Sequence, residues 1–242
     1  MSTEEIQKGV HFNYIKRFEG GSCVLDVILK KGEAVHLEGG VMAYHDENMT
    51  IETTKAAKGL MKSMKRMLAG EKFWMNKYTA QEDGIVGMAP NYPGDIMHIK
   101  IKQGDEWVVF KNGFMGCSPG LQMDTKFKGM KKALIGTGKS FQLVVRAEEQ
   151  DEDMFISALG GFMIRDLDEG ETLRIDNDHF VAREQSVDWG HKTVGGVKST
   201  LFSGEGLIIE ARGPGKVILQ TRSNIAFARW MVNAIKPYLP KD

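Results

Sequence analysis

The sequence GEAVHLEGGVMAYHDENMTIET, residues 32–53, decides the fold, because two later stretches repeat its pattern without a gap. They are GDEWVVFKNGFMGCSPGLQMDT, residues 104–125, and GETLRIDNDHFVAREQSVDWGH, residues 170–191. Each opens with a glycine and an acid, continues as an alternating strand, and restarts with apolar residues after a polar or glycine-rich turn. Self-similarity of this kind is typical of repeated supersecondary units. The sequence therefore predicts three diverged copies of one strand unit.

Apolar residues alternate along the first strand of each stretch, at Val35 and Leu37, Trp107 and Val109, and Leu173 and Ile175. This period of two indicates half-buried antiparallel strands, and the 28 glycines fit many tight turns between them. One unit alone cannot cover its apolar face, so we expect the three to pack around a shared core. The predicted units span approximately residues 10–93, 94–159 and 160–222 of a single mainly β domain that covers residues 1–242.

A C-terminal helix is predicted over residues 223–236. Ser223 or Asn224 can cap its first turn, apolar residues follow at helical spacing, and Pro237 stops it. We expect this helix to cover the end of a sheet, and a helix that faces a partner is the alternative.

Composition narrows the class of protein. The 32 basic and 32 acidic residues balance, which disfavours a globally basic nucleic-acid binder. The two cysteines, Cys23 and Cys117, are too few for a disulfide framework. The polar and acidic residues 1–9 predict no signal peptide, and no run of 18 uncharged apolar residues occurs. We therefore expect a cytoplasmic location.

The motifs predict neither an enzyme nor a cofactor or metal site. The histidines form no HxH or HExxH pattern, so His36 and His98 are interpreted as structural residues. Cys117 lacks a neighbour that would activate a thiol, and we expect it to be structural. The acidic run of residues 148–153 is interpreted as a solvated hairpin tip rather than a pair of catalytic carboxylates.

The strongest anomaly is TKAAKGLMKSMKRML, residues 54–68, which contains no acid. On a helix its methionines and leucines would share one face and its cations the other. The corresponding connection of the second unit is also basic. The residues that we predict to bind an anion or a partner are Lys55, Lys58, Lys62, Lys65, Arg66, Lys128, Lys131 and Lys132. An amphipathic cover with solvated lysines is the alternative.

Three segments resemble the altered-inheritance-of-mitochondria family: LAGEKFWMNKYTA at residues 68–80, PGDIMHIKI at residues 93–101, and GPGKVILQTRS at residues 213–223. The resemblance covers roughly residues 9–238, and that family is itself similar to the tryptophan RNA-binding attenuation protein. It implies three attenuation-protein-like β units, of the double-stranded β-helix or sandwich type. It also implies a homotrimer, in which nine units could form a ring, and it implies no catalytic residue.

The favoured function is a non-catalytic oligomeric β scaffold or binding protein. Its basic, methionine-rich connections would contact anionic lipid or an acidic protein. An RNA-binding protein is the alternative, although stacking platforms need aromatic residues beside the cations and few are near. A small-molecule binder or an enzyme with a site between units is the second alternative, which no motif supports.

Overall fold

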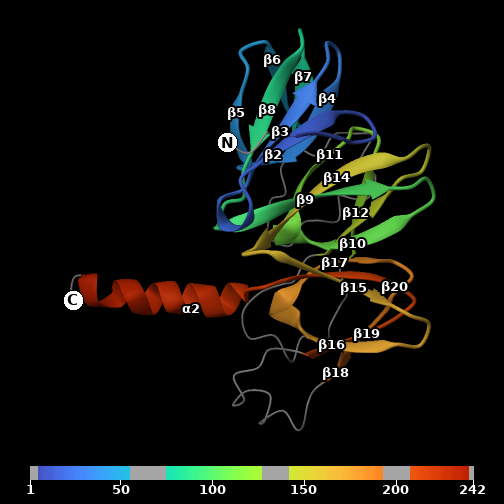
Figure 1. Cartoon of the computed structure of the whole chain (residues 1–242), viewed down its shortest axis with the longest axis vertical. Helices are drawn as coiled ribbons and strands as arrows, with labels where there is room; N and C mark the ends of the chain where they lie inside the picture. Colours follow the sequence, from blue (N-terminus) through green and yellow to red (C-terminus); the bar gives the residue numbers. More distant parts are fainter. Residues whose placement is uncertain (1–4, 55–74, 127–141, 193–207, 240–242) are drawn as a thin grey trace.

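Short apolar runs between glycine turns form antiparallel strands, and these build a stack of four sheets (Figure 1). This computed structural model describes residues 5–54, 75–126, 142–192 and 208–239. A mainly β fold with antiparallel sheets and one C-terminal helix is thereby confirmed.

The strands fall into three successive groups. The first third contains β1 (Ile6–Lys8), β2 (Asn13–Arg17), β3 (Val24–Leu29), β4 (Ala34–Glu38), β5 (Met42–His45), β6 (Met49–Thr54), β7 (Met75–Ala80) and β8 (Gly84–Met88). The second contains β9 (Gly94–Ile101), β10 (Glu106–Phe110), β11 (Phe114–Cys117), β12 (Gln122–Lys126), β13 (Gln142–Arg146) and β14 (Glu152–Leu159). The last contains β15 (Phe162–Leu167), β16 (Thr172–Asp176), β17 (Phe180–Glu184), β18 (Asp188–Lys192), β19 (Ile208–Arg212) and β20 (Gly215–Gln220).

One pairing scheme recurs in these groups. In the second, β14 lies between β9 and β11, while β13 lies between β10 and β12. The strands β3 to β8 and β15 to β20 pair in the same order. Between groups, β4 pairs with β11 and β10 pairs with β17. The unit boundaries and the attenuation-protein-like character of each group stay predictions.

The result is two complete six-stranded sheets between two shorter ones. The complete sheets are ordered β6-β7-β4-β11-β14-β9 and β12-β13-β10-β17-β20-β15. The short sheets, β1-β2-β3-β8-β5 and β16-β19-β18, lie at opposite ends of the stack (Figure 1).

The glycine that opens each repeated stretch has a local structural reason. Gly32, Gly104 and Gly170 have φ values of 86°, 87° and 78°, in the left-handed region where a side chain is strained. The same tight turn therefore precedes β4, β10 and β16.

Three apolar cores lie between successive sheets. The prediction of half-buried strands is wrong for β4 and β10, because each belongs to a sheet that is covered on both faces. His36 and Val108, at the supposedly solvent-facing positions, are both buried. The predicted alternation appears in β16, where Ile175 is buried and Arg174 is exposed, since β16 belongs to an end sheet.

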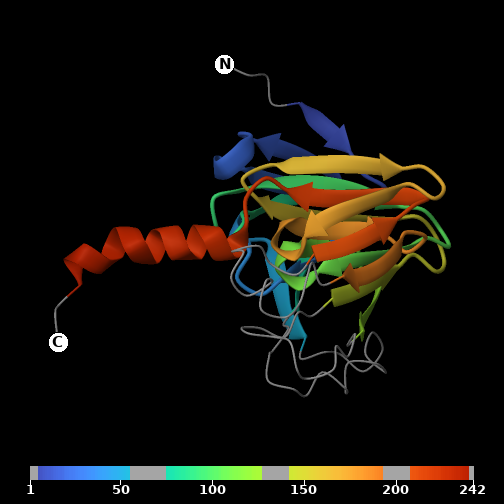
Figure 2. The same cartoon turned by 90° about the horizontal axis from the view of Figure 1, so that it is seen from below.

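Helix α2 (Asn224–Ile235) begins as predicted, with the Ser223 hydroxyl accepting a hydrogen bond from the Ala226 amide at 3.1 Å. A short 3-10 turn, η5 (Lys236–Tyr238), follows it. The expectation that this helix covers a sheet end is wrong. None of its residues is buried, and it projects sideways from the stack (Figures 1 and 2).

Candidate functional site

The predicted anion-binding residues lie outside the described residues, so the structure places none of them. They are Lys55, Lys58, Lys62, Lys65, Arg66, Lys128, Lys131 and Lys132. The described residues instead present three other features: a pair of sheet edges, a buried pair of carboxylates and the projecting helix.

The first feature is the pair of edges where the pairing scheme ends. Strand β16 is an edge of its sheet, although its counterparts β4 and β10 each pair with a strand of the next group. Strand β5 is likewise an edge, although its counterparts β11 and β17 each pair with a strand of the previous group. Among the described strands, neither edge has an outer neighbour. An unpaired edge offers backbone donors and acceptors to another chain.

The two junctions inside the chain have the same register. Leu37 lies opposite Gly116 and His36 opposite Cys117 in the first junction. Val109 lies opposite Ala182 and Val108 opposite Arg183 in the second. Counted from the glycine that opens each stretch, these are equivalent positions. The structure thus defines how a strand such as β16 would pair with a strand such as β5.

Tyr44 on β5 occupies the position of Gly116 and Ala182. It lies opposite Gly87, and a side chain on Gly87 would collide with the Tyr44 ring. In the two complete sheets the strand equivalent to β5 carries the small residue, and a large buried residue lies opposite it. Phe155 lies opposite Gly116, and Ile218 lies opposite Ala182. Tyr44 remains 44% exposed, and its hydroxyl donates to the buried Asp26 carboxylate. An aromatic ring is therefore held rigidly on the open face beside the β5 edge.

The second feature is a buried carboxylate pair at the start of β14. Asp153 is completely buried and accepts hydrogen bonds from the Val10 and His11 amides, both at 2.8 Å. The His98 Nε2 atom lies 2.6 Å from the same carboxylate. Burial alone would raise the pKa of Asp153, but these hydrogen bonds outweigh it and lower the pKa below its ordinary value. Asp153 thus fastens the N-terminal segment to the second group of strands.

Glu152, beside it, is also buried and accepts a hydrogen bond from the Ser118 hydroxyl. The His11 Nε2 atom lies 3.0 Å from its Oε2 atom. The prediction of a solvated hairpin tip is therefore wrong for these two acids, because the N-terminal segment folds over them. Glu148 and Glu149 are exposed as predicted. The sequence signal for the burial of Glu152 and Asp153 was their position immediately before the apolar run MFISAL of residues 154–159.

Cys117 and His36, the other residues considered for chemistry, lie in surroundings that favour a structural role. Burial raises the pKa of the Cys117 thiol, which has no exposed surface. Burial also lowers the pKa of His36, whose Nδ1 atom has no hydrogen-bond partner among the described residues. The described part of the chain contains no group of three or more His, Cys, Asp or Glu residues arranged to hold a metal ion. These surroundings favour a structural role for both residues.

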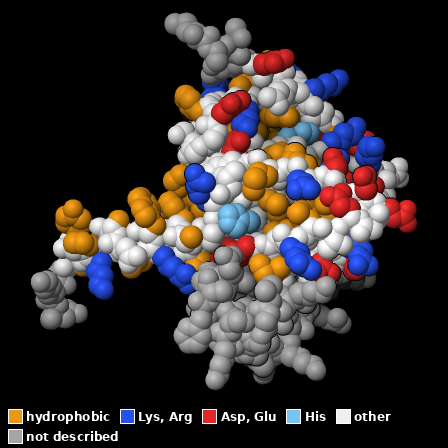
Figure 3. Space-filling view, turned by 60° about the horizontal axis from the view of Figure 1, so that its bottom comes forward, with side chains coloured by type: hydrophobic (Ala, Val, Ile, Leu, Met, Phe, Trp, Pro, Cys, Tyr) orange, Lys and Arg blue, Asp and Glu red, His pale blue; other side chains and the backbone are white. Residues whose placement is uncertain are grey.

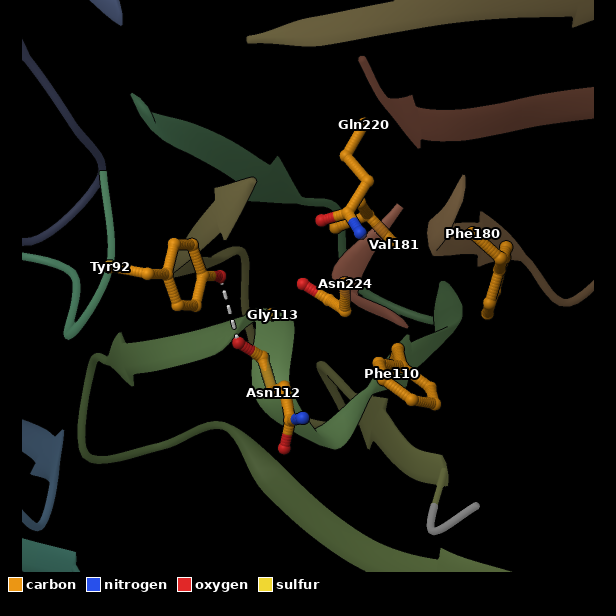
Figure 4. Close-up of a pocket in the computed structure, with 8 residues that line it drawn as sticks. All are labelled: Tyr92, Phe110, Asn112, Gly113, Phe180, Val181, Gln220 and Asn224. Atoms are coloured by element: carbon orange, nitrogen blue, oxygen red, sulfur yellow. Dashed lines mark hydrogen bonds between the residues drawn. The ribbon is translucent and has the colours of Figure 1, made fainter. Parts of the chain in front are cut away.

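A hollow of about 170 Å³ lies at the root of α2 (Figure 4). Tyr92 narrows it: its hydroxyl donates to the Asn112 carbonyl oxygen at 3.0 Å and lies 2.8 Å from the Ser157 hydroxyl. Phe110, Phe180 and Asn224 complete much of the wall. That volume includes open solvent and contains no enclosed space for a water molecule, whereas ligand pockets usually have volumes of about 300–1,000 Å³. The hollow therefore lends little support to a small-molecule site between units.

The third feature is the surface of α2 and η5. Arg229, Asn233 and Lys236 follow one another at helical spacing and form a single polar stripe. Around it are exposed apolar side chains, which gather along the projecting helix in Figure 3. They are Ile225, Trp230, Met231, Val232, Ile235, Tyr238 and Leu239. No described helix is long and apolar enough to cross a membrane.

Comparisons with known proteins show a family and two proteins to which this chain is similar. The profile of the family described as mitochondrial biogenesis AIM24 matches residues 17–222. An uncharacterized protein of Streptococcus pyogenes serotype M6 is 29% identical over 224 residues, which are 90% of this chain and 87% of that protein. The X-ray crystal structure of a Streptococcus pyogenes protein has the same fold, with a TM-score of 0.71 and 23% identity over 97% of this chain and 98% of that one.

Proposed function

This chain belongs to the mitochondrial biogenesis AIM24 family, and from that premise we propose that it is a non-catalytic β scaffold. Copies would join head to tail into a closed homotrimer. The observation that carries the proposal is that the end sheets contain complementary parts of the sheet that occurs complete twice inside the chain.

The strand orders support this directly. Strands β18, β19 and β16 correspond to the first three strands of a complete sheet, and β5, β8 and β3 correspond to its last three. Placing β16 of one copy beside β5 of the next would produce the six-strand order a third time, as β18-β19-β16-β5-β8-β3, which β2 and β1 extend to eight strands. The open edges would then be paired, which removes an aggregation hazard.

The equivalent junctions also predict the register. Ile175 would lie opposite Tyr44 of the next copy, Arg174 opposite His45, and Leu173 opposite Asp46. Tyr44 would then enter the third apolar core, which already contains Ile175. A head-to-tail interface of this kind forms a ring if its rotation closes. Three copies, each with three attenuation-protein-like units, would make the ring of nine units that the resemblance implies.

In the proposed homotrimer each basic connection would occur three times, once in each copy. We propose that residues 54–68 and the connection of the second group bind anionic lipid or an acidic protein. RNA binding is the alternative, and the same charge would serve it. Changing Lys58, Lys62 and Lys65 to Glu should abolish binding to anionic vesicles or RNA with little change in melting temperature. Parent protein that binds neither target at low salt would refute this part.

A disulfide tests the proposed interface. Residues directly opposite in an antiparallel pair have Cα atoms about 4.5–5.5 Å apart, within reach of a disulfide. Arg174→Cys combined with His45→Cys should form covalent trimers of about 81 kDa, three times the 27.0 kDa chain. Denaturing electrophoresis without reductant would reveal them, and light scattering would give the native mass.

The control moves one cysteine by one residue. In Arg174→Cys with Asp46→Cys the two side chains should leave opposite faces of the joined sheet, so cross-linking should fall sharply. Cys23 and Cys117 are buried and should not interfere. A monomer mass at micromolar concentration, or equal cross-linking in both variants, would refute the proposed assembly.

A further inference from the structure

We propose that α2 and η5 form an interfacial membrane anchor that inserts into the surface of an anionic lipid bilayer. This rests on the proposed function in one respect: it names the element by which the scaffold would hold the lipid to which its basic connections are attracted. It assigns the insertion to a part of the chain far from those connections in the sequence.

The first argument is exposure. Trp230 is 64% exposed and Tyr238 is 86% exposed, and the aliphatic side chains beside them are also uncovered. Burying one such side chain is favourable by about 1.5–3 kcal/mol. The hydrophobic effect therefore gives this helix a strong tendency to find an apolar environment that the described part of the chain does not provide.

The second argument is the width of the apolar surface. A helix that docks in a protein groove usually presents one stripe of anchors at i, i+3, i+4 and i+7. Here the polar residues occupy the narrow stripe, and the consecutive exposed apolar side chains Trp230, Met231 and Val232 point in directions about 100° apart around the axis. Insertion at the headgroup boundary covers such a broad surface in one step.

The third argument is charge. The chain is neutral overall, yet residues 211–239 contain no acid. Arg222, Arg229 and Lys236 are all exposed, and basic side chains lie along the projecting helix in Figure 3. Trp and Tyr beside cations are typical of segments that lie at a membrane surface. The complementary partner is a surface that is apolar below and negatively charged above, which describes an anionic bilayer.

The arrangement of α2 also leaves it free in the proposed ring. It projects sideways from the stack, away from the two end sheets that would join copies (Figure 1). Rotational symmetry would place the three helices on equivalent sides of the ring. Three linked anchors bind far more tightly than one, because the second and third insertions become intramolecular.

Flotation with vesicles tests the anchor. The parent protein should float with vesicles of phosphatidylcholine containing about one third phosphatidylglycerol, and much less with phosphatidylcholine alone. Trp230→Ser with Ile235→Ser should weaken binding at least tenfold. Arg229→Glu with Lys236→Glu should weaken binding and reduce its dependence on salt.

Two controls match these variants. Ile164→Ser removes an apolar side chain of similar exposure from β15, and Lys8→Glu with Lys102→Glu reverses two exposed charges elsewhere. Both should bind like the parent. An environment-sensitive dye on Val232→Cys should brighten with anionic vesicles, and the buried Cys23 and Cys117 leave that site as the reactive thiol of the described residues.

The outcomes separate this proposal from the previous one. Unchanged binding by the α2 variants, together with loss on changing Lys58, Lys62 and Lys65 to Glu, would overturn the anchor and leave the basic connections in place. The anchor would also be overturned if the parent protein did not bind vesicles and the α2 variants had a smaller native mass. The helix surface would then be a contact between copies.

Discussion

Replacing Asp153 by Asn should weaken the attachment of the N-terminal segment. The change keeps the size of the side chain and removes its charge. One oxygen of Asp153 accepts from the Val10 amide and contacts His98, and the other accepts from the His11 amide. An amide group in its place can keep the first oxygen, but it then points its own N–H groups at the His11 donor.

The expected loss follows from these contacts. Hydrogen bonds to a charged group each contribute about 1.5–3 kcal/mol, and breaking a buried charged contact on one side costs about 3–5 kcal/mol. Losing one of the three and weakening two should cost about 4 kcal/mol. For a chain of this length each kcal/mol moves the melting temperature by about 2–4 °C. We expect a fall on the order of 10 °C.

Thermal unfolding followed by circular dichroism measures the fall, and amide hydrogen exchange locates it. Exchange at Val10 and His11 should accelerate most. The control is Asp151→Asn, whose carboxylate is partly exposed and pairs with Lys100 at 2.9 Å. It should cost less than about 1 kcal/mol. A fall below about 2 °C for Asp153→Asn, or unchanged exchange at both amides, would refute the reasoning.

Acid should release the same contact, because the pKa of Asp153 is held below its ordinary value in the folded protein. The stability that the Asp153 carboxylate adds is complete above about pH 4 and is lost as the pH falls through the folded pKa. The urea midpoint of the parent should therefore drop in this acid range, and that of Asp153→Asn should drop much less. Burial and nearby Lys77 lower the pKa of His36, so the stability contributed by its neutral ring is complete above about pH 6.5 and falls with the pH below that value. His36→Val, which copies the equivalent Val108, should make the free energy of unfolding less dependent on pH between pH 7 and 5. An unchanged pH dependence would contradict this. Gly120→Ala should lower stability by about 1–3 kcal/mol in urea titration, because its new methyl group would overlap the Glu152 carboxylate, and an unchanged midpoint would show that the contact relaxes freely. Cys117 should resist thiol reagents until the protein unfolds, whereas labelling in the native state would show that its surroundings open.

Sequence reasoning located the features that depend on neighbouring residues. The glycine at the start of each repeated stretch is required by a left-handed backbone angle, which is a local property, and all three turns formed where the repeats place them. The Ser223 cap formed as expected because its acceptor and donor are three residues apart.

Tertiary structure decided how these elements are covered. Periodicity shows that a strand or helix has an apolar face, but it does not show what packs on the other face. His36 and Val108 are buried because a neighbouring group of strands lies over them. Apolar spacing predicted α2, yet α2 projects uncovered.

The buried acids show the same limit at longer range. Glu152 and Asp153 look like part of a solvated charged run, and their environment is set by His11, more than 140 residues earlier in the chain. Contacts over such a separation depend on the complete sheet stack, which no local pattern encodes. The sequence by itself determined the strands, their turns and the helix; only the tertiary structure decided which edges and faces remain open, because burial is a property of what the rest of the chain places alongside.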